Sequence, residues 1–236
     1  MKRFWTKAEA VEADGGWTVA LDGRPVRTPA GRPLALPTEA LARGVADEWA
    51  GVEGELQPGR LRLTGLANAA VDRIAPDAAA FAATLASYAD TDLLCYRAEG
   101  PTELIERQAA GWDAALDAFA DRHGVDFVRV TGVIPQPQPA LTRDVLLRRL
   151  GKRDAFALAG AATLVTTTGS LVLALLLADH GWNAEPGWSA ATLDERWQAE
   201  QWGSDEEAEA RLTDLRRQYD AALRLLELSK ATPRSR

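Results

Sequence analysis

Cysteine and histidine are almost missing from this chain of 236 residues, which holds one cysteine, Cys95, and two histidines, His123 and His180. A single thiol cannot form an intramolecular disulfide or a zinc site built on several cysteines, so the composition suits a reducing compartment. Each histidine stands beside a glycine at the end of a predicted helix, where the helix dipole favours a cation. We therefore expect neither histidine to act in catalysis.

A basic surface is missing as well. The 27 lysines and arginines are outnumbered by 34 aspartates and glutamates, which gives a net charge of −7 and a pI near 5.0. Nucleic-acid binders need a positive face to displace the counterions of phosphates, so this balance argues against that class. The first residues, MKRFWTKAEAVEADGG, lack the apolar core of a signal peptide and are too acidic for a transit peptide. The expected location is the cytoplasm.

Common catalytic motifs are also absent, because the sequence contains no HExxH, GxSxG, GxGxxG or GxxxxGK pattern. The segment GELQPGR at residues 54–60 has glycines at the spacing of a phosphate-binding loop, but Arg60 and Leu61 replace the lysine and the hydroxyl that such a loop needs. Asp90 and Asp92 offer a cation only two carboxylates, so a helix cap or a buried hydrogen bond is the expected role. We expect no cofactor and no metal.

Long apolar runs are scarce, with one exception. Residues 155–178, AFALAGAATLVTTTGSLVLALLLA, carry no charge and are long enough for a helix that crosses a bilayer. Hydroxyl groups and a glycine at residues 166–170 fill the middle of the run, and the mean hydropathy of the whole chain is −0.19. We therefore predict a buried central helix of a globular domain. A single-span membrane protein is the alternative.

The features that are present predict a small sheet followed by helices. Glycine-containing turns separate short strands up to residue 37, and the Asp-Gly pair at residues 22–23 is typical of a tight hairpin. Trp17, Val19 and Leu21 alternate with smaller residues, so one face of their strand should be buried. The expected fold is α+β but mainly α. A small N-terminal α+β domain with antiparallel strands should occupy residues 1–75, and a larger all-α domain built round the buried apolar helix should occupy residues 76–236.

Two tryptophans should serve this fold rather than a site. Thr38 offers an N-cap for a helix that ends near Trp49 and should cover the sheet. A second amphipathic helix is predicted at residues 101–123, with Trp112 on its apolar side. Because both indoles lie on apolar stripes, we expect them to be structural.

The last predicted helix should close the second domain. Ser204 and Glu207 have the spacing of a capping box at its start. Leu212, Leu215 and Tyr219 follow at helical spacing, so they should dock this helix against the apolar run or its neighbours.

Acidic residues gather round two tryptophans, Trp197 and Trp202, on a helix predicted at about residues 189–201 and just after it. The acidic residues are Asp194, Glu195, Glu200, Asp205, Glu206 and Glu207. One interpretation is a solvated helix face followed by an acidic first turn. A protein-binding surface is the second, because aromatic rings beside charges are typical of hot spots. The third is a hydrolase that uses Glu195 and Glu200 as acid and base. Residue chemistry alone ranks them in that order.

Six segments, in this order along the chain, resemble one family of proteins. They are LDGRPVRTP at residues 21–29, DEWAG at 47–51, LANAAVDR at 66–73, YADTDLLCYR at 88–97, RQAAGWD at 107–113 and LDERWQAEQWG at 193–203. Together they are similar to the ATP synthase assembly chaperones that receive the free α subunit, over nearly the whole chain.

The resemblance implies a chaperone without enzymatic activity, with a small α+β domain and a larger helical one. Its partner would be the α subunit of the F-type ATP synthase, whose β-facing surface it would shield from aggregation. We expect a monomer of the bacterial cytoplasm that neither binds nucleic acid nor inserts into a membrane. The family pattern LxExxQxxxWG falls on residues 193–203, and an acidic position there is tied to function in the family. This implies a partner-binding site formed by Glu195, Gln198, Trp202 and Glu206.

Overall fold

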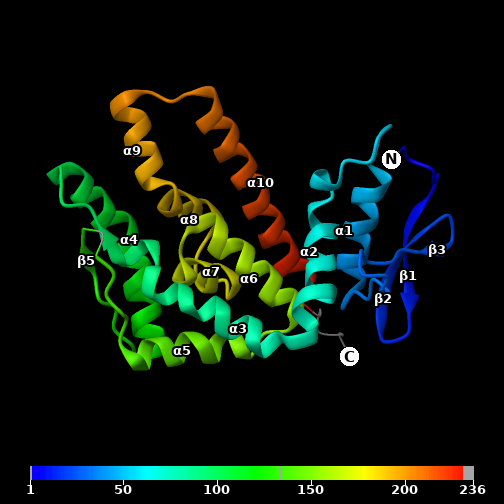
Figure 1. Cartoon of the computed structure of the whole chain (residues 1–236), viewed down its shortest axis with the longest axis horizontal. Helices are drawn as coiled ribbons and strands as arrows, with labels where there is room; N and C mark the ends of the chain where they lie inside the picture. The colour runs from blue at the N-terminus through cyan, green and yellow to red at the C-terminus, as the bar shows by residue number, and fades with distance from the viewer. Residues whose placement is uncertain (1, 133, 231–236) are drawn as a thin grey trace. The chain divides into compact units, whose positions relative to one another are not determined.

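The computed structural model describes residues 2–132 and 134–230, and the chain divides into two compact units (Figure 1). Unit 1 is formed by residues 1–78 together with 154–160 and 221–236, and unit 2 by residues 79–153 and 161–220. Two helices of the second half of the chain contribute residues to both units. The domains predicted at residues 1–75 and 76–236 stay a prediction.

A three-stranded antiparallel sheet opens unit 1. Its strands are β1 (Ala8–Ala13), β2 (Gly16–Leu21) and β3 (Arg24–Pro25), with β2 in the middle. Asp22 and Gly23 form the tight turn that was predicted, with φ angles of 47° and 79°. Pro25 lies in the edge strand β3, where the missing N–H of proline is tolerated.

Strand β2 is buried more deeply than its alternating pattern predicted. Val19 and Leu21 of the predicted face are buried, and Thr18 and Ala20 of the other face are buried as well. Helix α1 (Glu39–Ala50) packs on β1 and β2. Leu21 belongs to a further apolar cluster with Trp5, Val52 and Leu61, which come from segments outside the sheet. A central strand in so small a sheet is enclosed by the segments that precede and follow it.

The helices of unit 1 begin at residues that satisfy their free amides. The Thr38 hydroxyl accepts a hydrogen bond from the Leu41 amide at 3.1 Å, which confirms the predicted cap of α1. Helix α2 (Arg62–Ala69) begins against the Glu48 carboxylate, which accepts hydrogen bonds from the amides of Leu63 at 2.7 Å and Thr64 at 2.8 Å. Trp49, at the end of α1, packs on the cluster around Trp5.

Two of the six resembling segments contact each other in unit 1. Asp72 of LANAAVDR accepts hydrogen bonds from the Thr28 hydroxyl at 2.7 Å and the Ala30 amide at 3.0 Å. Thr28 belongs to LDGRPVRTP, so hydrogen bonds join these two motifs within unit 1.

Helices make up most of the rest of the chain. They are α3 (Ala78–Ala86), α4 (Thr102–His123), α5 (Ala140–Gly151), α6 (Ala155–Thr168), α7 (Leu171–Ala178), α8 (Ala184–Ala191), α9 (Leu193–Trp202) and α10 (Glu206–Leu228). One short parallel pair, β4 (Tyr96–Arg97) and β5 (Val130–Thr131), accompanies the helices of unit 2. The predicted class, α+β and mainly α with an N-terminal antiparallel sheet, is confirmed.

The apolar run at residues 155–178 is buried for most of its length, but it is two helices and not one. Gly169, with a φ of 67°, leaves the helical conformation after α6. Ser170 then caps α7, because its hydroxyl accepts a hydrogen bond from the Leu173 amide at 3.0 Å. All 8 residues of α7 are buried. Within residues 2–132 and 134–230, no helix has both the length and the apolar character needed to cross a bilayer.

Asp92 holds the junction between α6 and α7. Its side chain is 1% exposed, and its carboxylate accepts hydrogen bonds from the Leu94 amide at 3.0 Å and the Val172 amide at 2.9 Å. The neighbouring Leu93 amide donates to the Gly169 carbonyl at 2.9 Å. Burial raises the pKa of Asp92 to about 6, although these hydrogen bonds favour the charged form. The buried hydrogen-bonding role expected for this segment is confirmed.

Two predictions about the last third of the chain are wrong in detail. The helix expected at residues 189–201 is divided at Thr192 into α8 and α9. The capping box does not form, because the Asp205 carboxylate accepts the hydrogen bond from the Ala208 amide at 2.7 Å, while the Ser204 hydroxyl donates to Glu209. A carboxylate one residue further along competes for the same free amides of α10.

Helix α10 docks through its second half. The Tyr219 side chain is buried and donates a hydrogen bond to the Ala184 carbonyl of α8 at 2.8 Å. In unit 1, a Cβ atom on Gly160 of α6 would lie 2.6 Å from Cγ of Leu226, so these two helices touch at a glycine. Leu212 and Leu215 are only half-buried, so the predicted docking is confirmed for Tyr219 and is weaker toward the start of the helix.

Candidate partner-binding site

Helix α9 carries three of the four predicted site residues. It begins with Asp194 and Glu195 in its first turn, where carboxylates match the positive end of the helix dipole. It ends at Gly203, whose φ of 81° breaks the helix directly after Trp202. The helix packs on α4 in unit 2.

A buried glutamine fixes α9 in place. Gln108 of α4 is 2% exposed, and its side-chain amide donates to the Asp194 carboxylate at 2.8 Å. Its side-chain oxygen accepts a hydrogen bond from the Ala98 amide at 2.8 Å. One side chain therefore ties α9 and the loop after β4 to the same turn of α4. The Trp112 indole, one turn further along α4, donates to the Ala190 carbonyl of α8 at 2.8 Å.

Charged residues of α4 also brace α9. The Arg107 guanidinium lies 4.7 Å from the centroid of the Trp197 ring, which is buried. The same guanidinium pairs with Glu200 and with Glu103. These two carboxylates, Glu200 first, raise the pKa of Arg107. Glu200 is therefore engaged in an ion pair with Arg107 of α4.

The carboxylates proposed as an acid and a base in the hydrolase interpretation belong to different neighbourhoods. Glu200 pairs with Arg107 of α4, whereas a Glu195 oxygen lies 4.0 Å from an Arg211 nitrogen of α10. A hydrolase needs its two carboxyl groups on either side of one substrate bond. Glu195 and Glu200 instead contact arginines of two different helices.

A cleft of about 570 Å³ opens beside α9, toward the loop after β4 and the first turns of α4. Its lining combines apolar side chains with a few polar ones. The residues are Leu93, Tyr96, Arg97, Ala98, Glu99, Gly100, Pro101, Leu104, Gln108, Gly132, Asp194, Trp197, Gln198 and Trp202. A concave surface with convergent polar groups is the usual form of a binding site.

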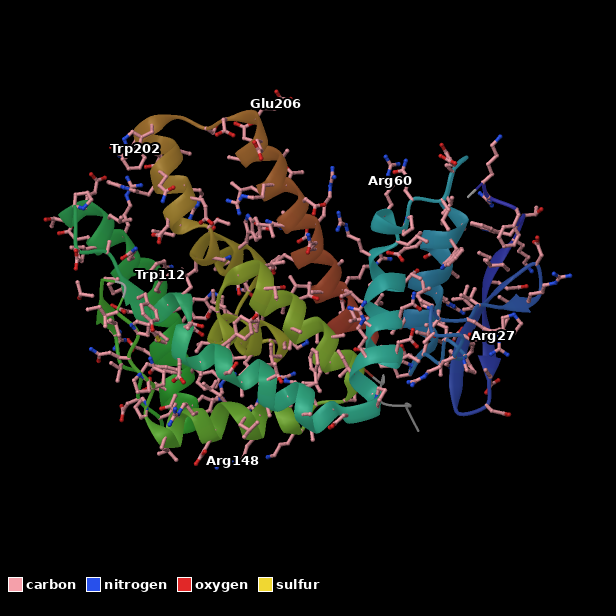
Figure 2. All side chains as sticks on the ribbon, in the orientation of Figure 1. Arg27, Arg60, Trp112, Arg148, Trp202 and Glu206 are labelled. Atoms are coloured by element: carbon pink, nitrogen blue, oxygen red, sulfur yellow. The ribbon has the colours of Figure 1, made fainter. Side chains whose placement is uncertain are left out.

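The predicted site residues lie in and around this cleft. Gln198 and Trp202 line it, whereas Glu195 and Glu206 are not part of its lining. The Trp202 indole is 78% exposed at the end of α9, and Figure 2 shows it pointing outward there. Figure 2 also shows Glu206 exposed at the start of α10, across the short connection between the two helices. Their role in binding stays a prediction.

Sequence reasoning missed the α4 and loop side of the cleft. Gln108 was visible as a polar residue within the apolar stripe of a predicted helix, and a buried amide in such a place needs partners. Glu99 and Pro101 carried no comparable signal, because a loop is brought to α9 only by the folded chain.

The side chains most often used for metal binding and nucleophilic chemistry have few partners suited to that role. Among the residues that the structure describes, no group of three or more histidine, cysteine, aspartate or glutamate side chains could hold a metal ion. Burial, followed by the charges of Arg149 and Arg122, lowers the pKa of His123, so the cation predicted at the end of α4 is disfavoured. Burial raises the pKa of the Cys95 thiol, which makes it a poor nucleophile.

Comparisons with known proteins agree on one family. The family model described as ATP12 chaperone protein matches residues 2–120. Protein atp12, mitochondrial, from Schizosaccharomyces pombe is 26% identical over 219 residues, which cover 88% of this chain and 75% of the relative. The crystal structure of Atp12 from Paracoccus denitrificans is 39% identical with a TM-score of 0.90, covering 97% of this chain and 98% of that one. The Atu1473 protein from Agrobacterium tumefaciens is 39% identical with a TM-score of 0.93, covering 97% and 86% of the two chains.

Proposed function

The chain belongs to the ATP12 family of chaperones, which act in the assembly of ATP synthase, and we propose that its client is the unassembled α subunit of the F-type enzyme. In this proposal the chaperone covers the α-subunit surface that later faces β and keeps it from aggregating. Membership of a chaperone family implies binding rather than catalysis. We infer a monomer of the cytoplasm that acts without a cofactor, nucleic acid or membrane insertion.

The observation that carries the proposal is the exposed indole of Trp202. A tryptophan side chain that is 78% exposed leaves a large apolar surface in water, and tryptophan is strongly enriched among the residues that dominate protein interfaces. Trp202 ends a helix whose preceding turns carry Glu195 and Gln198. We infer that these three residues and Glu206 contact the client.

The acidic residues near Trp202 favour a basic surface on the client. The connection from α9 to α10 and the first turn of α10 carry Asp205, Glu206, Glu207 and Glu209, within a protein of net charge −7. Acidic groups round an aromatic anchor favour a client patch rich in lysine or arginine, because complementary charges speed encounter and exclude wrong partners.

A refolding assay tests the proposal. Denatured α subunit is diluted into buffer with an equimolar amount of this chain, and light scattering and the soluble fraction are measured. We expect the chain to keep the α subunit soluble and to form an equimolar complex on size exclusion. The β subunit and an unrelated acidic protein of similar size are the controls. Aggregation of the α subunit at the same rate with and without the chain would refute the proposal.

The role of Trp202 is tested in the same assay. Trp202→Ala removes a side chain that is mostly in water, so its melting temperature should equal that of the wild type. The variant should nevertheless protect the α subunit poorly, whereas Trp202→Phe should retain part of the effect. Full protection by Trp202→Ala would remove this indole from the site.

A further inference from the structure

The cleft beside α9 is lined by apolar side chains and two carboxylates. Leu93, Leu104, Pro101 and the two indoles of α9 provide the apolar surface. Among its lining side chains that ionise at neutral pH, two are carboxylates, Glu99 and Asp194, and one is an arginine, Arg97. Glu99 is exposed and Asp194 is half-buried.

Arg97 already belongs to a balanced network of charges, in which Arg97 and Arg129 share Asp113 and Arg129 also pairs with Asp117. Its guanidinium lies 2.7 Å from an Asp113 oxygen, donates to the Gln108 carbonyl at 2.9 Å and stacks 5.1 Å from the centroid of the Trp112 ring. The side chain is only 10% exposed. The charge that the cleft offers to a ligand is therefore that of Glu99 and Asp194, which is negative.

The Asp194 carboxylate and the loop that carries Glu99 are held in position before a ligand arrives. Asp194 accepts a hydrogen bond from the buried Gln108 side chain on one of its oxygens. Glu99 lies over Gly132, where a Cβ atom would be 2.8 Å from a Glu99 oxygen. The loop that carries Glu99 is tied to α4 through the hydrogen bond between Gln108 and the Ala98 amide. A preorganised site loses less entropy on binding than a flexible one.

We propose that this cleft binds one lysine or arginine side chain from an extended, otherwise apolar segment of the client. The methylene groups of such a side chain pack on Leu104, Trp197 and Trp202, while its charged end reaches Glu99 and Asp194. The inference rests on the proposed function, since it names the part of the client that the cleft takes.

The same protein already uses this arrangement next to the cleft. Arg107 places its guanidinium over the Trp197 ring and pairs with Glu103 and Glu200. The Trp197 indole of α9, flanked by these two carboxylates, thus already binds one arginine side chain. Anionic ligands suit the cleft poorly, because Glu99 and Asp194 repel them and Arg97 is engaged with Asp113.

A peptide scan identifies the segment. Overlapping 12-residue peptides that cover the α-subunit sequence are immobilised and probed with the fluorescently labelled chain. We expect the bound peptides to contain a lysine or arginine flanked by apolar residues. Replacing that cation by glutamate should abolish binding, and replacing it by norleucine should weaken it. Peptides bound equally well without any cation would overturn the inference.

Variants of the cleft are then measured in solution with the strongest peptide, by fluorescence anisotropy. Glu99→Lys should weaken binding by about tenfold or more, because it places like charges together. Glu99→Gln should weaken it less. Glu106→Lys is the matched control, since Glu106 is an exposed glutamate in the first turns of α4 that does not line the cleft. Circular dichroism verifies that each variant is folded.

Failure of this inference is distinguishable from failure of the proposed function. If the wild type does not protect the α subunit, the proposed client is wrong. If the wild type protects it and Glu99→Lys protects it equally well, the client is right and the cationic anchor is refuted. If Glu99→Lys and Glu106→Lys lose protection equally, the effect comes from net charge, and the cleft is again refuted.

Discussion

Helices α7 and α9 are similar in length and opposite in environment. All 8 residues of α7 are buried, whereas α9 buries only Leu193 and Trp197 among its 10 residues. Helix α7 carries no charged residue, and α9 carries acidic residues and ends on an exposed tryptophan. The first is held by the hydrophobic effect and the second by a few specific hydrogen bonds and ion pairs. A helix that the fold does not need to bury is free to present its side chains to a partner.

The largest expected difference in stability is between variants of a buried tryptophan, Trp112, and an exposed one, Trp202. Trp112→Ala should destabilise the protein by about 3–5 kcal/mol, because it leaves a cavity in the core and removes the hydrogen bond to the Ala190 carbonyl. Trp202→Ala should leave the free energy of unfolding almost unchanged, since that indole is mostly in water. Urea unfolding followed by circular dichroism measures both. Equal stability of the two variants would contradict the division between core and site.

Asp92 should make the stability of the core depend on pH. Its pKa is about 6 in the folded protein and near 3.8 when unfolded, so the folded state binds the proton more tightly. The contribution is present below pH 4 and is lost as the pH rises through 6, by about 3 kcal/mol in total at 1.36 kcal/mol per pKa unit. Asp92→Asn should remove this part of the pH dependence in urea titrations between pH 4 and 7.5. An unchanged pH profile in a folded Asp92→Asn variant would show that another group titrates.

A smaller loss of stability is expected from a change where α6 and α10 pack closely. Gly160→Val puts a side chain where a Cβ atom lies 2.6 Å from Leu226 Cγ, so α6 and α10 must separate or Leu226 must shift. Overpacking of this kind costs about 1–3 kcal/mol. Thermal unfolding measures the loss, and Gly65→Ala on α2 is the control, because a Cβ atom there meets no atom within 4 Å. A Gly160→Val protein as stable as the control would show that the contact is loose.

Sequence patterns predicted those features of the fold that depend on residues close together in the chain. The Asp-Gly turn at residues 22–23, the Thr38 cap and the burial of the apolar run each depend on neighbouring residues. The break at Gly169 was not predicted, because one amide freed there, that of Val172, is satisfied by Asp92, which is 80 residues away. The cleft was missed for the same reason, since Gln108 bonds Asp194 across 86 residues. Contacts of this kind leave no periodic trace in a sequence.

The smallest effect on stability, with a large effect on binding, is expected for Glu195→Lys. The Glu195 side chain is 38% exposed, and its ion pair with Arg211 is long, at 4.0 Å. An exposed pair of this length contributes little to folding. The variant should therefore keep its helical dichroism and melt within a few degrees of the wild type. It should nevertheless fail to protect the α subunit, because lysine would repel the basic client surface that we propose.

A charge swap separates two explanations of such a loss. If Glu195 acts by holding Arg211, then adding Arg211→Glu to Glu195→Lys restores an opposite pair and should restore protection. If Glu195 contacts the client, the swapped pair still presents a lysine to it and protection should stay lost. Glu12→Lys, an equal change of charge at an exposed position of β1, controls for net charge and should protect like the wild type. We expect the swap to fail and the control to succeed. Recovery in the double variant would assign Glu195 to the packing of α9 against α10, and an unfolded single variant would assign it to the fold.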